Sequence, residues 1–489
     1  MNITSIEVRM YNTGSVGDCL LLLFYKEQTL SCKLMIDCGG WNAPKETIVK
    51  CVKDILKTCK GELDLLVVTH QHLDHISGFN QAREEFNQMH IKELWLSWIE
   101  DRKDPVGQIL LEKYGKKLAE LSRRTGAAHE MIAKALTGVN TDSRLCKMLK
   151  AKAEKLTYTQ DLINLEVDRQ GSNLVGAGLT NNDAMAFVEK KAIKVSYLRP
   201  GTVLKDLPGL QGIKIYMLGP PRDEDMRYFR MDTEKDEMYA AQSSVDMEHA
   251  RQMLTKGRIA DSGMILNEGE SPFENKYLLQ AEEKERWIKD LYEHEEVKHR
   301  QIETDWLETA ASVALRVNRL TNNTSLAMAI ECTKSGQVLL FPGDGQSGNW
   351  MGWHKPEVSK AFKAEGGRTP QELLKNTVLY KVGHHGSHNG TASKSGLDLM
   401  NHRDLVAMLP LVQDQIPEAW GGVTNFPAHA LYSALIEKTS GRLIRADIGI
   451  ETNDRAEKAR QTLTDVDLQQ FISAVKKGSC YYSFTIQIG

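Results

Sequence analysis

The chain lacks a long apolar run and an excess of charge of either sign. Its longest apolar run covers residues 20–25, far short of the roughly 20 residues that a membrane helix needs, so we expect no membrane association. Lys and Arg number 62 against 65 Asp and Glu, for a net charge of −3. A protein that coats DNA needs a broad basic surface, which this balance excludes. A nucleic-acid enzyme with a local basic groove remains compatible with it.

The chain also lacks clustered cysteines and a targeting signal at its start. No two of its eight cysteines form a C-x-x-C pair, which favours reduced thiols over a disulfide framework. Residues 1–5 carry no basic segment followed by an apolar one, so we expect no secretory signal. Together these features predict a cytoplasmic protein. The cysteines are at positions 19, 32, 38, 51, 59, 146, 332 and 480.

Apolar patterning predicts an α/β layered fold. The 489 residues are 41% hydrophobic, enough for a real core, and at roughly 150 residues per domain the length suggests about three domains. Strand-like segments are followed by a segment, residues 45–58, whose apolar residues have helical spacing, an order typical of α/β layers. The predicted strands cover residues 6–10, 20–25, 33–37, 63–69, 325–331, 338–341, 378–382, 406–409 and 481–488, with strand-like texture also at 197–218 and 443–450.

Two helical, charge-dense stretches interrupt the strand-rich parts. They cover about 101–195 and 222–320. We therefore expect one core, formed by residues 1–100, 195–221 and 320–489, that is split by two helical insertions. The insertions are the place where we expect an oligomer contact or a protein partner.

The densest group of reactive side chains is the segment His70-Gln71-His72-Leu73-Asp74-His75. It holds three of the 14 histidines of the chain, directly after a predicted buried strand. Imidazole and carboxylate are ligands of zinc and of other borderline divalent metals. The alternative is a His-rich turn without a ligand, which the sparseness of histidine elsewhere disfavours.

Other predicted strands end in residues of the same kind. Asp37 precedes Gly39, Asp344 lies between two glycines, and His384 and His385 follow the strand at 378–382. Each is ambiguous alone, since an Asp in a glycine turn is commonly structural. Several strands of one sheet that each end in a metal-type ligand are what a two-metal site needs.

These segments together resemble the metallo-β-lactamase superfamily. Within it they are most similar to the hydrolase domain of ComEC-type competence proteins and its stand-alone relatives. The resemblance covers roughly residues 1–100, 195–221 and 320–489 and leaves out both insertions. It is carried by the His70–His75 segment, Gly343-Asp344 and His384-His385-Gly386-Ser387, and for the branch by Val16-Gly17-Asp18, Ile36-Asp37, Asn323-Thr324-Ser325-Leu326, Arg199-Pro200-Gly201 and Leu218-Gly219-Pro220-Pro221.

The resemblance implies an αββα sandwich whose active site lies at one edge of the paired sheets. It assigns His70 and His72 to a first metal, and Asp74, His75 and His384 to a second, with Asp344 bridging the two. His385 is the alternative to His384. Further groups, Asp18, Asp37, His385 and Ser387, would support the ligands, and such support is common around ligating imidazoles.

One departure concerns the first metal. Many family members supply a third histidine to it from between the His cluster and the Gly-Asp pair. The histidines in that interval lie in no recognisable context, so the first site is weaker or is completed by another group. They are His90, His129, His249, His294 and His299.

The chemistry implied by the resemblance is hydrolysis at two divalent ions, with zinc expected first and manganese as the alternative. A metal-bound hydroxide, oriented by Asp74, would attack the substrate, because metal binding lowers the pKa of water to about 7. The branch favours a phosphodiester, so we expect a phosphodiesterase or nuclease acting on a nucleic acid or nucleotide. The alternatives are a lactone, ester or amide hydrolase on the same site, and a partner-gated effector subunit of a bacterial defence system.

Four residues downstream are candidates for substrate contacts. Asn425 or His429 could bind a phosphoryl oxygen, and His429 could protonate the leaving group; alternatively His429 packs on a helix that starts nearby. Lys381 and His388 are candidate substrate contacts, although an outward-facing strand lysine is the simpler interpretation of Lys381. The aromatic pair Trp350 and Trp353 could stack a base or pack beneath a loop.

Overall fold

The computed structural model describes residues 2–110, 150, 181–222, 238, 259–260, 263–264, 318–416 and 426–488. The chain divides into two compact units. The first comprises Met1–Tyr114, Asn164–Gln242 and Arg319–Gly489, and the second comprises Gly115–Ile163 and Ser243–Asn318. Of the second unit, the described residues are Lys150, Asn318 and an antiparallel pair, β9 (Ile259–Ala260) and β10 (Gly263–Met264). The two predicted helical insertions lie mostly outside the described residues, so that division stays a prediction.

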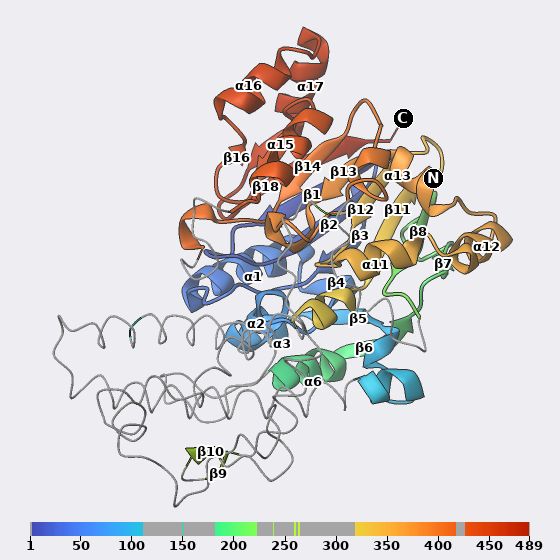
Figure 1. Cartoon of the computed structure of the whole chain (residues 1–489), viewed down its shortest axis with the longest axis vertical. Coiled ribbons are helices and arrows are strands. Elements are labelled where there is room, and N and C mark those ends of the chain that lie inside the picture. The colour runs from blue at the N-terminus through green and yellow to red at the C-terminus, as the bar shows by residue number, and fades with distance from the viewer. Residues whose placement is uncertain are drawn as a thin grey trace, which may run out of the picture. The chain divides into compact units, whose positions relative to one another are not determined.

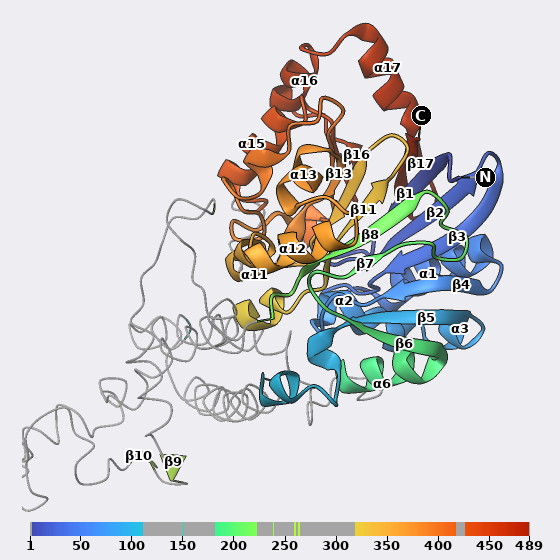
Figure 2. The ribbon, with the colours of Figure 1, turned by 90° about the vertical axis from the view of Figure 1, so that its right-hand side faces the viewer.

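The first unit contains two mixed sheets of eight strands each (Figure 2). In spatial order, the first sheet comprises β17 (Val475–Lys477), β18 (Tyr481–Gln487), β1 (Ser5–Tyr11), β2 (Leu20–Lys26), β3 (Thr29–Ile36), β4 (Glu62–Val67), β5 (His90–Ser97) and β6 (Ala192–Leu198). The second sheet comprises β16 (Gly449–Ile450), β15 (Leu443–Arg445), β14 (Val406–Leu409), β13 (Thr377–Lys381), β12 (Val338–Phe341), β11 (Ala327–Cys332), β8 (Ile213–Gly219) and β7 (Val203–Leu204).

Each sheet has a parallel half and an antiparallel half. Strands β3, β4, β5 and β6 are parallel neighbours, as are β12, β13, β14 and β15. The first strand, β1, pairs antiparallel with β2 on one side and with β18 on the other, so that Ser5 is opposite Gln487. The carboxyl ends of parallel strands meet at one edge of a sheet, and these edges carry the candidate site.

Apolar side chains fill three layers between and around the sheets. Leu20, Leu22 and Phe24 face the second sheet, where they join residues such as Met328 and Ile330. Leu21 and Leu23 point to the opposite face and pack with helix α1 (Lys45–Cys59). Since successive side chains of a strand alternate between faces, β2 is buried on both, which explains its continuous apolar run. The arrangement is an αββα sandwich, as the sequence predicted.

Helices cover the outer face of each sheet (Figures 1 and 2). Helix α1 buries one stripe, formed by Ile48, Val52 and Ile55, and it ends at Lys60, which adopts a left-handed conformation. On the first sheet lie α1 (Lys45–Cys59), α2 (Leu73–Gln81), α3 (Arg83–Asn87) and α6 (Asn181–Lys191). The helices that follow β12 are α11 (Ser347–Trp353), α12 (Pro356–Ala364), α13 (Pro370–Lys375), α15 (His429–Lys438), α16 (Asp454–Arg460) and α17 (Asp465–Ala474).

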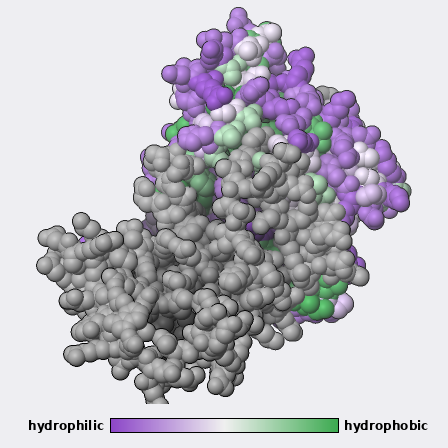
Figure 3. Space-filling model, viewed as in Figure 1, coloured by the Kyte–Doolittle hydropathy of each residue, from purple (hydrophilic) through white to green (hydrophobic). Residues whose placement is uncertain are grey.

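Polar side chains dominate the described surface at the top of Figure 3, where α16 and α17 lie. Helix α16 buries Ala456 alone, and α17 buries Phe471 alone. Among the described helices, none combines the length and the apolar character needed to span a membrane.

Candidate metal centre

Three backbone segments meet at the edge of the first sheet, and they approach so closely that two glycines are required. A Cβ atom on Gly39 would lie 2.4 Å from the carbonyl carbon of Asp74, and one on Gly17 would lie 2.8 Å from the carbonyl oxygen of Asp74. Hydrogen bonds join the same segments, from Asp18 N to Asp74 O at 3.0 Å and from Gly39 N to Asp18 O at 2.9 Å. The Gly-Asp and Asp-x-Gly pairs of the sequence therefore serve to bring the three loops together.

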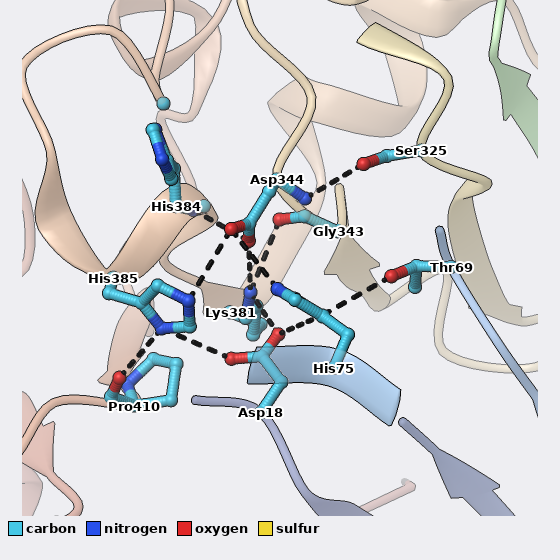
Figure 4. A network of polar contacts seen from close by, with 12 residues as sticks. Asp18, Thr69, His75, Ser325, Gly343, Asp344, Lys381, His384, His385 and Pro410 are labelled. Atoms are coloured by element: carbon cyan, nitrogen blue, oxygen red, sulfur yellow. Dashed lines mark hydrogen bonds and ion pairs between the residues drawn. The ribbon is translucent and has the colours of Figure 1, made fainter. Parts of the chain in front are cut away.

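Four buried side chains from both sheets form the centre of the site. They are Asp74, His75, Asp344 and His385, and each offers an atom within 4.8 Å of the others. The Nε2 atom of His75 lies 3.1 Å from Oδ2 of Asp344. The Nε2 atom of His385 lies 3.0 Å from Oδ2 of Asp74 and 3.4 Å from Oδ2 of Asp344. Asp344 is thus the shared member of the group (Figure 4).

Asp37 holds the His75 ring in place. Nδ1 of His75 donates to Oδ2 of Asp37 at 2.8 Å. The backbone N–H and the hydroxyl of Thr69 each donate to the same carboxylate at 2.7 Å. Because Nδ1 is engaged by Asp37, Nε2 is the ring nitrogen of His75 that faces Asp344. This is the orienting contact that ligating histidines commonly have.

The two neighbouring histidines of the second sheet point in different directions. His384 and His385 have φ values of 47° and 50°, and Gly386 has 83°, so three successive residues adopt the left-handed conformation that costs energy for residues other than glycine. His385 points inward, and its Nδ1 donates to the carbonyl oxygen of Pro410 at 3.0 Å. Figure 4 shows the His384 ring turned away from the Asp344 carboxylate.

His384 belongs to a polar group beside the cluster. Its Nδ1 lies 3.0 Å from Oδ1 of Asn389, which also accepts from the Ser387 hydroxyl at 2.9 Å. Its backbone N–H donates to Oδ1 of Asp344 at 3.0 Å. The resemblance assigned His384 to the second metal, with His385 as the alternative. In the structure, His385 is the one whose ring contacts the carboxylates of Asp74 and Asp344. Ser387 donates to Asn389 and, among the described residues, not to a carboxylate of the cluster.

His70 and His72 form a second group beside the first. Nε2 of His70 lies 3.0 Å from Nδ1 of His72, while Nδ1 of His70 lies 3.0 Å from the Thr69 hydroxyl and 3.3 Å from the Ser325 hydroxyl. Burial, together with His75 and His72, holds the pKa of His70 well below its ordinary value, so the ring is neutral. Two imidazole nitrogens this close suit a shared metal ion.

Within the described part of the chain, no third histidine joins this pair. His90 is the exposed first residue of β5, and His129, His249, His294 and His299 lie outside the described residues. Ser325, which the sequence did not single out for this place, contacts His70 and also accepts a hydrogen bond from the backbone N–H of Asp344 at 3.1 Å. The Ser325 hydroxyl therefore links His70 to the Asp344 backbone, through the ring nitrogen of His70 that does not face His72.

Lys381 provides a buried positive charge behind the cluster. Its side chain is 2% exposed. The ammonium pairs with the Asp18 carboxylate, lies 3.3 Å from Oδ1 of Asp344, and donates to the carbonyl oxygen of Gly343 at 3.2 Å. Although burial opposes the charge, Asp18 and Asp344 outweigh it and raise the pKa of Lys381. The side chain points between the sheets and contacts the site's own carboxylates. It therefore does not face outward from the strand, and its contacts are with the site and not with a substrate.

The cluster carries strong opposing charges. Burial alone would raise the pKa of Asp74, but His75 and His385 outweigh it and lower the value to about 2. Burial alone would lower the pKa of His385, but Asp344, Asp74 and Asp18 outweigh it and raise the value to about 10. The same balance raises the pKa of His75 well above its ordinary range.

Several buried atoms of the cluster are left without a hydrogen bond. Among the described residues, none bonds to Asp74 Oδ1, His75 Nε2 or Asp344 Oδ2, although buried polar atoms are satisfied in most proteins. Two of these atoms, on His75 and Asp344, face each other at 3.1 Å. A carboxylate oxygen and an imidazole nitrogen converging in this way fit a divalent metal ion, which would engage the His75 and Asp344 atoms.

The charge balance predicts how the metal-free protein responds to pH. His385 binds its proton more tightly in the folded chain (pKa about 10) than in the unfolded chain (about 6.5). Its contribution to the free energy of unfolding is therefore complete below about pH 6.5 and is lost as the pH rises toward 10. We expect the melting temperature of the EDTA-treated protein to fall over this window. In the H385Q variant the melting temperature should fall less steeply with pH. An equal slope in both proteins would show that His385 is not the group that loses its proton.

The remaining predicted residues lie elsewhere. Asn425 is outside the described residues. His429 is the exposed first residue of α15, beside a surface hollow that Tyr432, Ser433 and Asn453 also line. His388 is exposed at the end of the loop that carries His384 and His385. These positions leave the proposed roles of Asn425, His429 and His388 as predictions.

The two tryptophans near Asp344 pack rather than face solvent. Trp350 and Trp353 are fully buried, and their rings lie 4.0 Å apart. The Trp350 indole N–H is shared between the carbonyl oxygens of Gly345 and Gly390, at 3.0 and 3.2 Å. The pair therefore braces the Asp344 loop against the loop that follows His385.

The chain matches no protein-family model and no curated protein. What can be said of its class therefore comes from its own architecture. Two mixed eight-stranded sheets, with a buried group of His and Asp residues where they meet, are consistent with a metallo-β-lactamase-like αββα fold.

Proposed function

We propose that the protein is a metal-dependent hydrolase related to the metallo-β-lactamase superfamily, and that its substrate is a phosphodiester in a nucleic acid or nucleotide. The observation that carries the hydrolase assignment is the buried group Asp74, His75, Asp344 and His385, whose ligand atoms converge from both sheets. In a merely structural role these polar atoms would be hydrogen-bonded. Three of them, Asp74 Oδ1, His75 Nε2 and Asp344 Oδ2, have no hydrogen bond to a described residue.

Two sets of residues would hold the ions. His70 and His72 would bind one, and Asp74, His75 and His385 would bind the other, with Asp344 shared by both. Zinc suits the many imidazole nitrogens, and manganese is the alternative. When bound, such a pair of ions activates water and polarises the scissile group, and it stabilises charge on the attacking and leaving oxygens.

The chain's own groups then orient the reactants. Asp37 and the Pro410 carbonyl fix the His75 and His385 rings, at 2.8 and 3.0 Å. Oδ2 of Asp74 contacts His385, while Oδ1 forms no hydrogen bond with a described residue. Oδ1 is therefore available to accept a hydrogen bond from an attacking water and to aim its lone pair.

The choice of a phosphodiester rests on the resemblance to the ComEC-type branch. The same kind of site can also hydrolyse a lactone, ester or amide, because each of these reactions needs an activated water and a polarised oxygen on the scissile group. A partner-gated effector would carry the site and yet be silent in isolation. Substrate trials must separate these three outcomes.

We expect the purified protein to contain about two divalent ions per chain, measured by inductively coupled plasma mass spectrometry. It should cleave bis-p-nitrophenyl phosphate, single-stranded DNA or RNA. EDTA should abolish cleavage, and Zn²⁺ or Mn²⁺ should restore it. The D74A variant should be inactive but folded by circular dichroism.

The same panel should include a lactone and a p-nitrophenyl ester. Turnover of these without any phosphodiester cleavage would replace the substrate class but keep the hydrolase. Full activity in EDTA-treated protein, or in D74A, would overturn the metal-dependent mechanism. A metal-loaded chain that cleaves none of the substrates would favour the partner-gated effector.

A further inference from the structure

A group of thiols lies in the outer layer of the first sheet. Cys19, Cys38, Cys51 and Cys480 are all buried in the apolar cluster between this sheet and α1. They come from four separate parts of the sequence, and Cys480 lies 480 − 51 = 429 positions beyond Cys51. Nothing in the proposed hydrolase chemistry uses them.

Cys51 and Cys480 both contact the backbone of Asn12. The Cys51 thiol lies 3.4 Å from the carbonyl oxygen of Asn12, and the Asn12 N–H donates to the carbonyl oxygen of Cys480 at 2.9 Å. The interaction between the two thiols raises the pKa of Cys51 and lowers the pKa of Cys480. The two sulfurs are therefore neighbours, although one residue is on α1 and the other directly precedes β18.

The two thiols of the pair are not equivalent. Cys480 is 9% exposed and Cys51 is 1% exposed, so a small oxidant reaches Cys480 first. The Cys480 sulfur also accepts from the Ser479 hydroxyl at 3.7 Å. The hydrogen bond from Cys51, with that of Ser479, lowers the pKa of Cys480 to about 7, which makes it partly thiolate near neutral pH.

Other cysteines of the chain provide an internal comparison. Burial raises the pKa of Cys32, Cys59 and Cys332 to about 12. These thiols stay protonated at neutral pH, and the protonated thiol is a poor nucleophile. A reactive cysteine combines thiolate character, access and a neighbouring thiol that can resolve it, and Cys480 has all three.

We propose that Cys480 and Cys51 form a hydroperoxide-responsive dithiol. The Cys480 thiolate attacks one oxygen of hydrogen peroxide, which gives Cys480 sulfenic acid and releases hydroxide. The released hydroxide takes the proton of the Cys51 thiol and becomes water. The Cys51 thiolate then attacks the sulfenic sulfur, which forms the disulfide and releases hydroxide. The peroxide is reduced by two electrons and the two thiols are oxidised.

The disulfide would link the start of the sandwich to its end. Cys480 precedes Tyr481, which pairs with Tyr11 of β1, and Cys51 is on the helix that packs against α2. The bond would close a loop of more than 400 residues, and long loops lose the most conformational freedom in the unfolded chain. The oxidised protein should therefore melt at a higher temperature than the reduced protein.

The test treats the full-length protein with hydrogen peroxide, blocks the remaining thiols with N-ethylmaleimide, and maps disulfides by peptide mass spectrometry without reduction. We expect a Cys51–Cys480 linked peptide that dithiothreitol removes, and modification of Cys480 about tenfold faster than that of Cys332. In C51S, dimedone should trap the sulfenic acid on Cys480. C480S should form neither product, and the matched control C332S should behave as wild type.

Because the readout is a peptide mass, it is independent of the hydrolase assignment. If C51S fails to fold, C51A provides the same test. Equal oxidation rates for Cys480 and Cys332, or a peroxide-treated protein without the linked peptide, would overturn the proposal.

Discussion

Replacing His385 by alanine is expected to remove one metal equivalent per chain and to lower kcat/KM by about a thousandfold. A bound ion supplies several kcal/mol of transition-state stabilisation, and each 1.36 kcal/mol is a factor of ten in rate. His385 is the histidine whose Nε2 lies 3.0 Å from Asp74 and 3.4 Å from Asp344. Its loss would take one nitrogen from the group that holds the second ion.

The neighbouring histidine is the matched control. His384 has the same backbone conformation as His385, but its ring contacts Asn389 and not a carboxylate of the cluster. H384A should therefore keep its metal content, and a change confined to KM would indicate a substrate contact. Metal content is measured by mass spectrometry and activity with bis-p-nitrophenyl phosphate. Loss of metal in H384A together with full content in H385A would reverse the assignment of the two residues.

Replacing Lys381 by methionine is expected to lower the free energy of unfolding of the metal-free protein by about 3–5 kcal/mol. The change removes the cation that faces the Asp18 and Asp344 carboxylates, and breaking one side of a buried ion pair has a cost of this size. Urea unfolding followed by circular dichroism measures the loss. With metal present the loss should be smaller, because a divalent ion supplies positive charge to Asp344.

Lys92 is the matched control for this variant. It also pairs with two carboxylates, Glu62 and Asp64 at 2.9 and 2.8 Å, but its side chain is 46% exposed. K92M should cost no more than about 1 kcal/mol, as exposed pairs do. If K381M were as stable as K92M, the buried ammonium of Lys381 would not be stabilising the negative charges of Asp18 and Asp344.

Much of the fold could be predicted because its central strands are buried on both faces. Residues 338–341 and 406–409 are predicted strands that the structure reproduces as β12 and β14. Such strands are continuous apolar runs, which are visible in one sequence. Strands β5 and β6 were not predicted, since Lys92, Glu93 and Lys194 interrupt their apolar pattern. Their side chains exchange ion pairs across the edge of the sheet, as from Lys194 to Glu93 at 2.9 Å.

The residue types of the candidate site could be predicted more readily than their orientations. The candidate metal ligands follow strands β4, β12 and β13. The ends of these strands are visible in the apolar pattern of the sequence. Which of two adjacent histidines faces inward depends on the left-handed turn at His384 and His385, for which only Gly386 gives a hint. The inward direction of Lys381 depends on its carboxylate partners, which come from residues 18 and 344. Contacts at such separations leave no local signal in the chain.

The pairing of β1 with β18 has a consequence for biosynthesis. β1 is synthesised well before β18, and one of its two hydrogen-bonding edges stays open until residues 481–487 have been made. An open edge is a template for pairing with other chains, and chains fold as they emerge. The nascent protein must therefore keep this edge from pairing wrongly throughout translation, so a chaperone that holds the β1–β2 hairpin would raise the yield of folded chains more than one that acts after release.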